Sequence, residues 1–187
     1  MDVLREQPRT PWRREGPPGI VLGVDLSAAQ RGRSLIAFSR QDVPTLRTIH
    51  TPENLSAKGA YELISEAGAK VTFLATGTEV SLAVEAKNKL AAEGIAARVV
   101  SMPCWKLFEE QPEDYRKQVL GPGTVKVAIE AAAREGWDRY IGSELLGPAG
   151  AFVGMHGFGA SGPYKDVYAK FGITADAAVA AAKKLLK

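Results

Sequence analysis

The sequence is poor in the residues that build disulfides, metal sites and membrane spans. Cysteine occurs once, as Cys104, and histidine twice, as His50 and His156. One cysteine cannot form an internal disulfide, which favours a reducing compartment. No apolar run approaches the ~18 residues of a membrane span, and residues 1–14 lack the apolar core of a signal peptide. We therefore expect a cytoplasmic protein without a membrane segment.

Basic runs are also missing. The 24 Lys and Arg residues are scattered among 21 Asp and Glu, which leaves a net charge of only +3. The sequence has neither a basic cluster nor an RNA-type aromatic motif, so nucleic acid is not an expected partner. Its 45% hydrophobic content is enough for a packed core. A chain of 187 residues has room for one domain, or for one domain and a fragment of another.

The most regular stretch predicts a βαβ unit. Residues 71–75 form an uncharged apolar run, which is typical of a strand buried on both faces. The spacing of Thr76 and Glu79 predicts a capping box, and the apolar residues that follow recur with a helical period. Gly94 is placed to end that helix in a left-handed conformation. Residues 95–102 then indicate a second strand, parallel to the first.

The pattern further along the chain is also that of an α/β fold. The expected elements are a helix ending near Leu120, a strand over 125–129, short strands over 136–141 and 151–155, a helix from Ser161 to Phe171, and a last helix over 175–186 capped by Thr174. We therefore predict a three-layer α/β sandwich. Its mostly parallel sheet has about five strands, with helices on both faces.

The beginning of the chain gives a weaker pattern. Residues 1–33 contain four prolines and six arginines, with little periodicity. Residues 34–38 (SLIAF) indicate a short strand. Residues 45–61 indicate an extended linker, and residues 62–69 a turn that leads into the βαβ unit.

Two glycine motifs could bind a phosphate group. The segment GFGASG at residues 157–162 matches G-x-G-x-x-G. A dinucleotide site would need a further strand with an acid about 20 residues later, but the chain continues there as helix. A tight turn that permits close packing is the better interpretation, so an independent nucleotide-binding protein is not expected. Thr76-Gly77-Thr78 could hold an anion at a helix N-terminus, but without a lysine or a longer glycine loop an ordinary turn is favoured.

Several single residues are candidates for a functional role. Cys104 follows a proline and is interpreted as a packed residue rather than a nucleophile. His50 and His156 have no acid, cysteine or second histidine at a useful spacing, which argues against a metal site. Glu130 ends a buried strand, where it could be a functional acid or, in the favoured alternative, part of a structural hydrogen-bond network. Arg40 follows an expected strand and could reach a substrate phosphate, although its spacing alone favours a solvated arginine.

From residue 34 onward the sequence resembles transketolase. The matching segments follow the order of the family and extend over most of the chain. They are IAFSRQDVP at 36–44, KGAY at 58–61, FLATGTEVSLAVEA at 73–86, RVVSMPCWKLFEEQ at 98–111, Tyr115, AIEAA at 128–132, GW at 136–137, FGASGP at 158–163 and FGIT at 171–174.

The resemblance implies that the chain is part of a larger enzyme. Transketolases are homodimers of three-domain subunits that hold thiamine diphosphate and a divalent metal between subunits. Their C-terminal domain carries no catalytic group and helps to form the dimer. By resemblance, residues 71–187 correspond to that domain, and residues 34–70 to the last strand of the pyrimidine-binding domain with a linker. Arg40 then corresponds to the arginine that binds the phosphate of the sugar phosphate, and no catalytic, cofactor or metal residue has a counterpart.

The departures from the family limit what the chain can do alone. It lacks the G-D-G…N metal–diphosphate motif, the acid that activates the aminopyrimidine and the catalytic histidines. Ketol transfer needs the electron sink of the cofactor, so we expect no activity from the chain by itself.

Two functional hypotheses remain. The chain is the C-terminal portion of a transketolase of the pentose phosphate pathway, or a non-catalytic subunit of a split transketolase that docks on a separately encoded N-terminal half. The expected partners are a second copy or that N-terminal half, with a sugar phosphate bound only in the full assembly. Residues 154–163, together with Trp137 and Tyr140, are expected to form an exposed apolar surface through which subunits associate.

Residues 1–33 depart most from the family. Relatives carry an amphipathic helix with a D-A-V-E-T type start before the IAFSRQ strand, whereas this chain has TPWRR at residues 10–14. A one-base shift of one coding of TPWRR reads D-A-V-E-T. One hypothesis is therefore that residues 1 to about 24 are translated out of frame, with the frame of the family regained before Ser34. Such a segment would be irregular.

Overall fold

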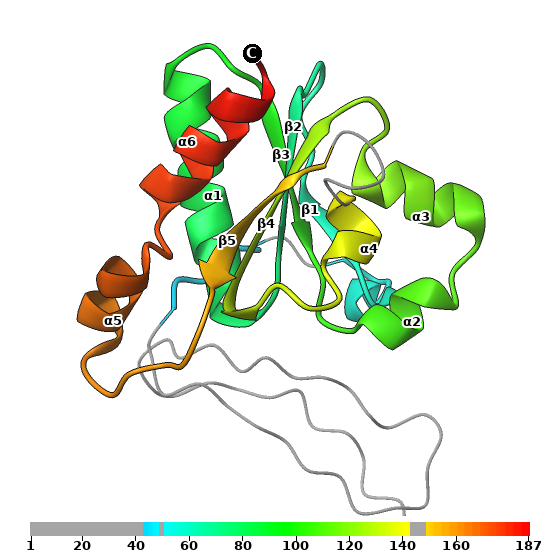
Figure 1. Ribbon diagram of the computed structural model, residues 1–187. Helices are drawn as coiled ribbons and strands as arrows, with labels where there is room; N and C mark the ends of the chain where they lie inside the picture. The colour runs from blue at the N-terminus through cyan, green and yellow to red at the C-terminus, as the bar shows by residue number, and fades with distance from the viewer. Residues whose placement is uncertain (1–42, 49–50, 143–148) are drawn as a thin grey trace, which may run out of the picture.

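The centre of the molecule is a five-stranded sheet in the order β1-β3-β2-β4-β5. The computed structural model describes residues 43–48, 51–142 and 149–187. Four strands are parallel, and the first pairs antiparallel at one edge (Figure 1). The strands are β1 (Tyr61–Ile64), β2 (Val71–Ala75), β3 (Ala97–Ser101), β4 (Val125–Ala133) and β5 (Ala151–Met155).

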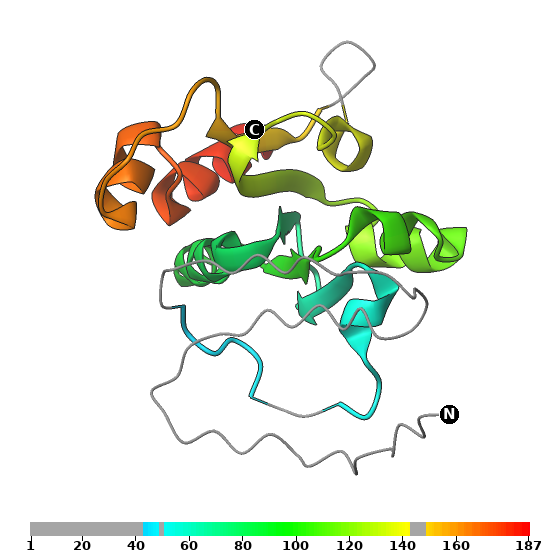
Figure 2. The ribbon, with the colours of Figure 1, turned by 90° about the horizontal axis from the view of Figure 1, so that it is seen from below.

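Helices cover both faces of this sheet and make it the middle of three layers. One group consists of α1 (Val80–Ala92), α5 (Tyr164–Phe171) and α6 (Ala175–Leu185), and the other of α2 (Trp105–Glu109), α3 (Glu113–Leu120) and α4 (Asp138–Ile141). Seen from below, the sheet lies between the two groups (Figure 2). The predicted class, a mostly parallel α/β sandwich with helices on both faces, is confirmed.

Strand β2 is the middle strand of the sheet, and all five of its residues are buried. Successive side chains of a strand point to opposite faces. Phe73 therefore joins the apolar cluster under α1 and α6, whereas Leu74 joins the cluster under α2, α3 and α4. Each of these side chains contributes roughly 1.5–3 kcal/mol through burial. The uncharged run that predicted a strand buried on both faces thus connects the two halves of the core.

Helices α1 and α6 lie side by side on one face and are held by local signals that the sequence shows. Helix α1 ends just before Gly94, whose φ of +75° is the left-handed conformation expected there. Helix α6 begins at the predicted cap, because the Thr174 hydroxyl accepts the amide of Ala177 at 3.1 Å. Lys89 of α1 reaches Asp176 of α6 at 2.6 Å. Together, α1 and α6 form one layer on this face, with α1 over β2 and β3 and α6 over β4 and β5.

The segment 136–141, predicted as a short strand, is helix α4 instead. Trp137 and Tyr140 in this segment are 0% and 5% exposed. The prediction that these two residues belong to an exposed apolar surface is therefore also wrong. The rings pack edge-on against Trp105, at centroid distances of 5.0 and 5.4 Å. A four-residue helix has too little periodicity to be told from a strand, and aromatic packing decides between them.

The segment 62–69, predicted as a turn, begins as part of strand β1. All four residues of β1 are only partly buried, and Glu62 forms an ion pair of 2.8 Å with Arg98 of β3. An edge strand is paired on one side and tolerates charge, so it lacks the apolar run of a central strand. The division of the chain at residues 33 and 70 stays a prediction.

Several predictions fall outside the described residues. These are the segment 1–33, the strand over 34–38, Arg40 and His50. In the part that is described, no helix has both the length and the apolar character needed to cross a membrane.

Candidate functional site

The carboxyl ends of β2 and β4 are where an open α/β sheet most often places a site. From β2 the chain passes through α1 to β3 on one side, and from β4 it continues to β5 on the other side. Two neighbouring strands whose connections leave in opposite directions open a crevice at their carboxyl ends. Two acidic side chains stand there, Glu79 directly after β2 and Glu130 within β4.

Glu79 is turned into the protein and is only 6% exposed. Its Oε1 accepts a hydrogen bond from the Thr78 hydroxyl at 2.8 Å and another from the hydroxyl of Tyr168 in α5. The predicted capping box is wrong, because the side chain of Thr76 makes no cap bond. A short 3₁₀ turn, Gly77–Glu79, precedes α1 and directs the carboxylate toward Tyr168.

The carboxyl group of Glu79 lies close to the turn considered as an anion site. A Cβ placed on Gly77 would lie 3.7 Å from Oε2 of Glu79.

Glu130 is held by Trp137, the residue just before α4. Its Oε2 accepts the indole N–H of Trp137. Burial raises the pKa of Glu130, the indole donor opposes this, and the charge of Glu79 adds to the rise. The bond to Trp137 is consistent with the favoured interpretation, a structural hydrogen-bond network.

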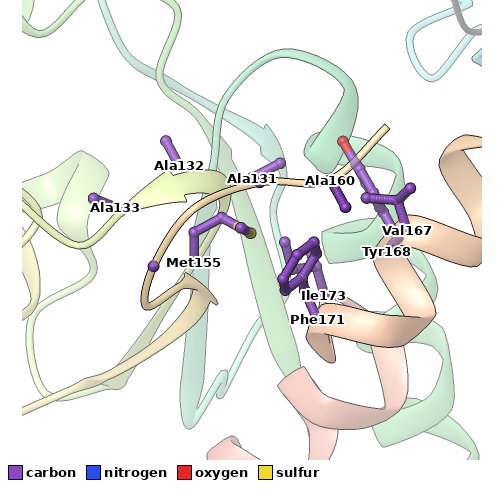
Figure 3. A pocket seen from close by; sticks show the side chains of 11 residues that line it. Ala131, Ala132, Ala133, Met155, Ala160, Val167, Tyr168, Phe171 and Ile173 are labelled. Atoms are coloured by element: carbon purple, nitrogen blue, oxygen red, sulfur yellow. The ribbon is translucent and has the colours of Figure 1, made fainter. Parts of the chain in front are cut away.

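An apolar pocket lies beside these acids at the carboxyl ends of β4 and β5. It has a volume of about 360 Å³, and its walls come from two strand ends, the following loop and α5 (Figure 3). The pairing of β4 with β5 shifts register between Glu130 and Ala133. Such a bulge frees residues from the ladder, and Ala131 and Ala132 line the pocket. The other side chains that line it are Ala133, Met155, Ala160, Val167, Tyr168, Phe171 and Ile173.

The glycine motif forms the loop between β5 and α5, and the predicted close packing is found at only one of its three glycines. No described atom lies within 4 Å of a Cβ placed on Gly157 or Gly159, whereas a Cβ on Gly162 would lie 3.3 Å from Cγ2 of Val167. Ser161 does not cap α5, which begins at Tyr164 after Pro163. Proline is well suited to a helix start, because its φ is already close to the helical value and it has no amide N–H that would need a partner. The loop leaves Phe158 99% exposed.

The remaining candidates are explained by packing or stay untested. Cys104 is half-buried, and its amide donates to the carbonyl of Gly59 at 2.9 Å. His156 is exposed. Within the described ranges no three His, Cys, Asp or Glu side chains are grouped to hold a metal ion.

Sequence reasoning missed Tyr168 and the pocket. Tyr168 follows Tyr164 by one helical turn, which marks an amphipathic face of α5 but not its contact with Glu79. The bulge at Ala131 and Ala132 gave no local signal, because alanine suits a strand exit as well as a pocket wall.

Comparison with known proteins accounts for this architecture. A sequence model described as the transketolase-like TK C-terminal domain matches residues 59–174. The chain belongs to the transketolase C-terminal domain family. The match includes β1, all four parallel strands and α5.

Full-length transketolases are much longer than this chain. The chain is 50% identical over 161 residues to a transketolase of Rhodobacter capsulatus, covering 85% of the chain and 24% of the relative. It is 55% identical over 156 residues to one of Sinorhizobium medicae, covering 82% and 22%. The chain thus spans about a quarter or less of these transketolases.

Solved transketolases share the fold. The structure of transketolase from Leishmania mexicana matches with a TM-score of 0.63 and 42% identity, over 70% of this chain and 18% of that one. A structure described as "Split gene transketolase, inactive beta4 tetramer" matches with a TM-score of 0.60 and 26% identity. There the match covers 79% of this chain and 48% of the other.

Proposed function

We propose that the chain acts as the C-terminal portion of a transketolase, in the transfer of two-carbon ketol units between sugar phosphates. Its role is to support assembly, while the chemistry takes place on thiamine diphosphate and a divalent metal held by other domains. Its partners are a second copy and a transketolase N-terminal portion, in the cytoplasm. The observation that carries this proposal is the match of the transketolase C-terminal domain model to residues 59–174.

The hydrogen bonds of the two acids at the carboxyl ends of the inner strands support an assembly role. Both carboxyl groups accept hydrogen bonds from segments that pack against the sheet: Glu79 from Tyr168 of α5, and Glu130 from Trp137, the N-cap residue of α4. A general acid or base must be able to reach substrate, whereas these groups hold secondary structure in place. We therefore assign no catalytic residue. Arg40 is proposed to bind the substrate phosphate only when the other domains complete its pocket.

The test is complementation in a coupled ketol-transfer assay. The chain is assayed alone with thiamine diphosphate and magnesium, and then together with the remaining N-terminal portion of the Rhodobacter capsulatus relative. We expect no transfer from either part alone and transfer from the mixture. An Arg40→Ala variant in the same mixture should raise KM for the sugar phosphate. Transfer by the chain alone, or none from the mixture, would contradict the proposal.

A second candidate function is the non-catalytic subunit of a split transketolase. The match to the split-gene structure favours it, because the chain covers 48% of that protein but only 18% of the Leishmania transketolase. A neighbouring gene that encodes only the missing N-terminal domains, and whose product co-purifies with this chain, would support it. A continuous reading frame that joins those domains to this chain would exclude it.

A further inference from the structure

Three charged side chains form a row across the sheet near the amino ends of its parallel strands, away from the candidate site. Thr72 of β2 is paired in register with Arg98 of β3 on one side and with Lys126 of β4 on the other. Paired residues of neighbouring strands point to the same face, so the two cations flank Thr72, which is 0% exposed. Glu62 of β1 completes this charged row through its ion pair of 2.8 Å with Arg98.

The two cations of the charged row differ in their partners. The Nη2 of Arg98 donates to the carboxylate of Glu62 and, at 3.2 Å, to the carbonyl of Val119 at the end of α3. The Nζ of Lys126 donates to the carbonyl of Thr124 at 3.2 Å, and no acidic group in the described part of the chain affects its pKa. Other lysines are held in ion pairs, namely Lys58, Lys87, Lys89, Lys117 and Lys183.

The surroundings of Lys126 favour its neutral amine. The side chain is half-buried, and this burial lowers the pKa of Lys126 from its ordinary value of 10.5, while the nearby charge of Arg98 lowers it further. At pH 7 an amine of pKa 10.5 is free in only about 1 part in 3,000, and each unit by which the pKa falls raises this fraction tenfold. Because the free amine is the nucleophile, a desolvated lysine beside another cation is an activated one.

We propose that Lys126 is an acylation site whose ε-amine accepts the acyl group of a small acyl phosphate. The amine attacks the acyl carbon, the new C–N bond forms as the C–O bond to phosphate breaks, inorganic phosphate leaves, and the amine proton passes to water. The donor is an anion, and the charged row holds two cations against one carboxylate, so the donor is attracted. The amide product is uncharged, which relieves the like-charge repulsion between Lys126 and Arg98.

The first experiment compares lysines within the unmodified full chain. The chain is incubated with acetyl phosphate at neutral pH, and peptide mass spectrometry gives the acetylation rate of each lysine. Lys70 is the matched control, because it directly precedes β2 and is exposed. We expect Lys126 to react at least about fivefold faster than Lys70, since a gain in free amine of tenfold per pKa unit outweighs its lower accessibility. Trace labelling with acetic anhydride at several pH values should give Lys126 the lower titration midpoint.

The second experiment separates the charge of Arg98 from its structural role. Arg98→Gln removes the neighbouring charge and should slow acetylation of Lys126 at least about twofold relative to Lys70. Arg98→Lys keeps the charge and should restore the rate. Glu62→Gln breaks the same ion pair as Arg98→Gln, but it leaves the positive charge unbalanced, so it should not slow Lys126. The two glutamine variants therefore distinguish electrostatic activation from a local disturbance of the strands.

Three results would overturn the proposal. They are acetylation of Lys126 no faster than that of Lys70, a titration midpoint of Lys126 as high as that of Lys70, and equal slowing by Arg98→Gln and Glu62→Gln. Thermal unfolding checks that each variant keeps the fold, and if Arg98→Gln does not, the rate and midpoint of the unmodified chain decide alone. The proposal is independent of the proposed function, because none of these measurements involves ketol transfer.

Discussion

The hydroxyl of Tyr168 donates a hydrogen bond to the buried carboxylate of Glu79, 89 residues earlier in the chain. The bond joins the loosely packed helix α5, which has no fully buried residue, to the turn between β2 and α1. It thereby holds one wall of the pocket against the central strand of the sheet.

Removing this hydroxyl should destabilise the protein. Tyr168→Phe leaves a buried carboxylate without one of its donors, which typically costs about 1–3 kcal/mol. Urea unfolding measures the change in free energy. Tyr164→Phe on the same helix is the control, and an exposed hydroxyl should change stability by less than about 0.5 kcal/mol. Equal effects of the two variants would show that the Tyr168–Glu79 bond is not stabilising.

Glu130 should make stability depend on pH. Its pKa is raised above the ordinary value of 4.5, mainly by burial, so the folded protein favours the protonated form. The contribution is fully present below pH 4.5 and is lost as pH rises through the raised pKa. Glu130→Gln keeps an oxygen acceptor for Trp137 but cannot ionise, so its unfolding free energy should fall less over this range.

The control for that titration is Glu113→Gln. Lys117 lowers the pKa of Glu113, first through a hydrogen bond, so this carboxylate favours folding once it is ionised. Its replacement should remove stability at higher pH, the opposite sign to Glu130→Gln. The same slope for both variants in urea unfolding at several pH values would contradict the assignment.

Gly59 should be far less replaceable than Gly68. Both have a left-handed backbone, with φ of +80° and +69°. A Cβ on Gly59 would lie 2.2 Å from the amide nitrogen of Phe108 and 2.3 Å from the carbonyl oxygen of Cys104, whereas one on Gly68 meets no described atom within 4 Å. Gly68→Ala should cost about 1–2 kcal/mol, the conformational term alone. Gly59→Ala should cost clearly more, because backbone must move, and similar values for the two variants would contradict this.

Thr72 should be stabilising through its hydroxyl. This residue of β2 is 0% exposed, and its Oγ1 lies 2.6 Å from Oγ1 of Thr124. Thr72→Val keeps the shape but leaves the Thr124 hydroxyl without this partner, which should cost about 1–2 kcal/mol. Thr51→Val removes an exposed bond to the Glu53 carbonyl and should be nearly neutral, as thermal unfolding can test.

The parts of the fold that could be predicted are those with local causes. The apolar run of β2, the period of α1, Gly94 and the Thr174 cap each act within a few residues, and each was predicted correctly. Strand β1 was missed because a half-exposed edge strand can carry charged residues such as Glu62.

The candidate site was less predictable because its causes are distant in the chain. Glu130 could be placed at a strand end from sequence, but its partner Trp137 comes from a helix predicted as a strand. Glu79 was assigned to a local capping box, since nothing nearby in the sequence indicates Tyr168. The pocket depends on a bulge in β4 and on α5 together, so no single segment encodes it.

The position of α6 in the chain has a consequence for synthesis. This helix follows all five strands, yet Ala178 and Ala182 are fully buried in the cluster that contains Phe73 and Val99. A ribosome therefore releases every strand before it releases the helix that covers β4 and β5 on this face, whereas α1, on the same face, is made earlier. During that interval the nascent chain exposes the apolar part of the sheet that α6 later covers, which is the kind of surface that chaperones bind and that drives aggregation.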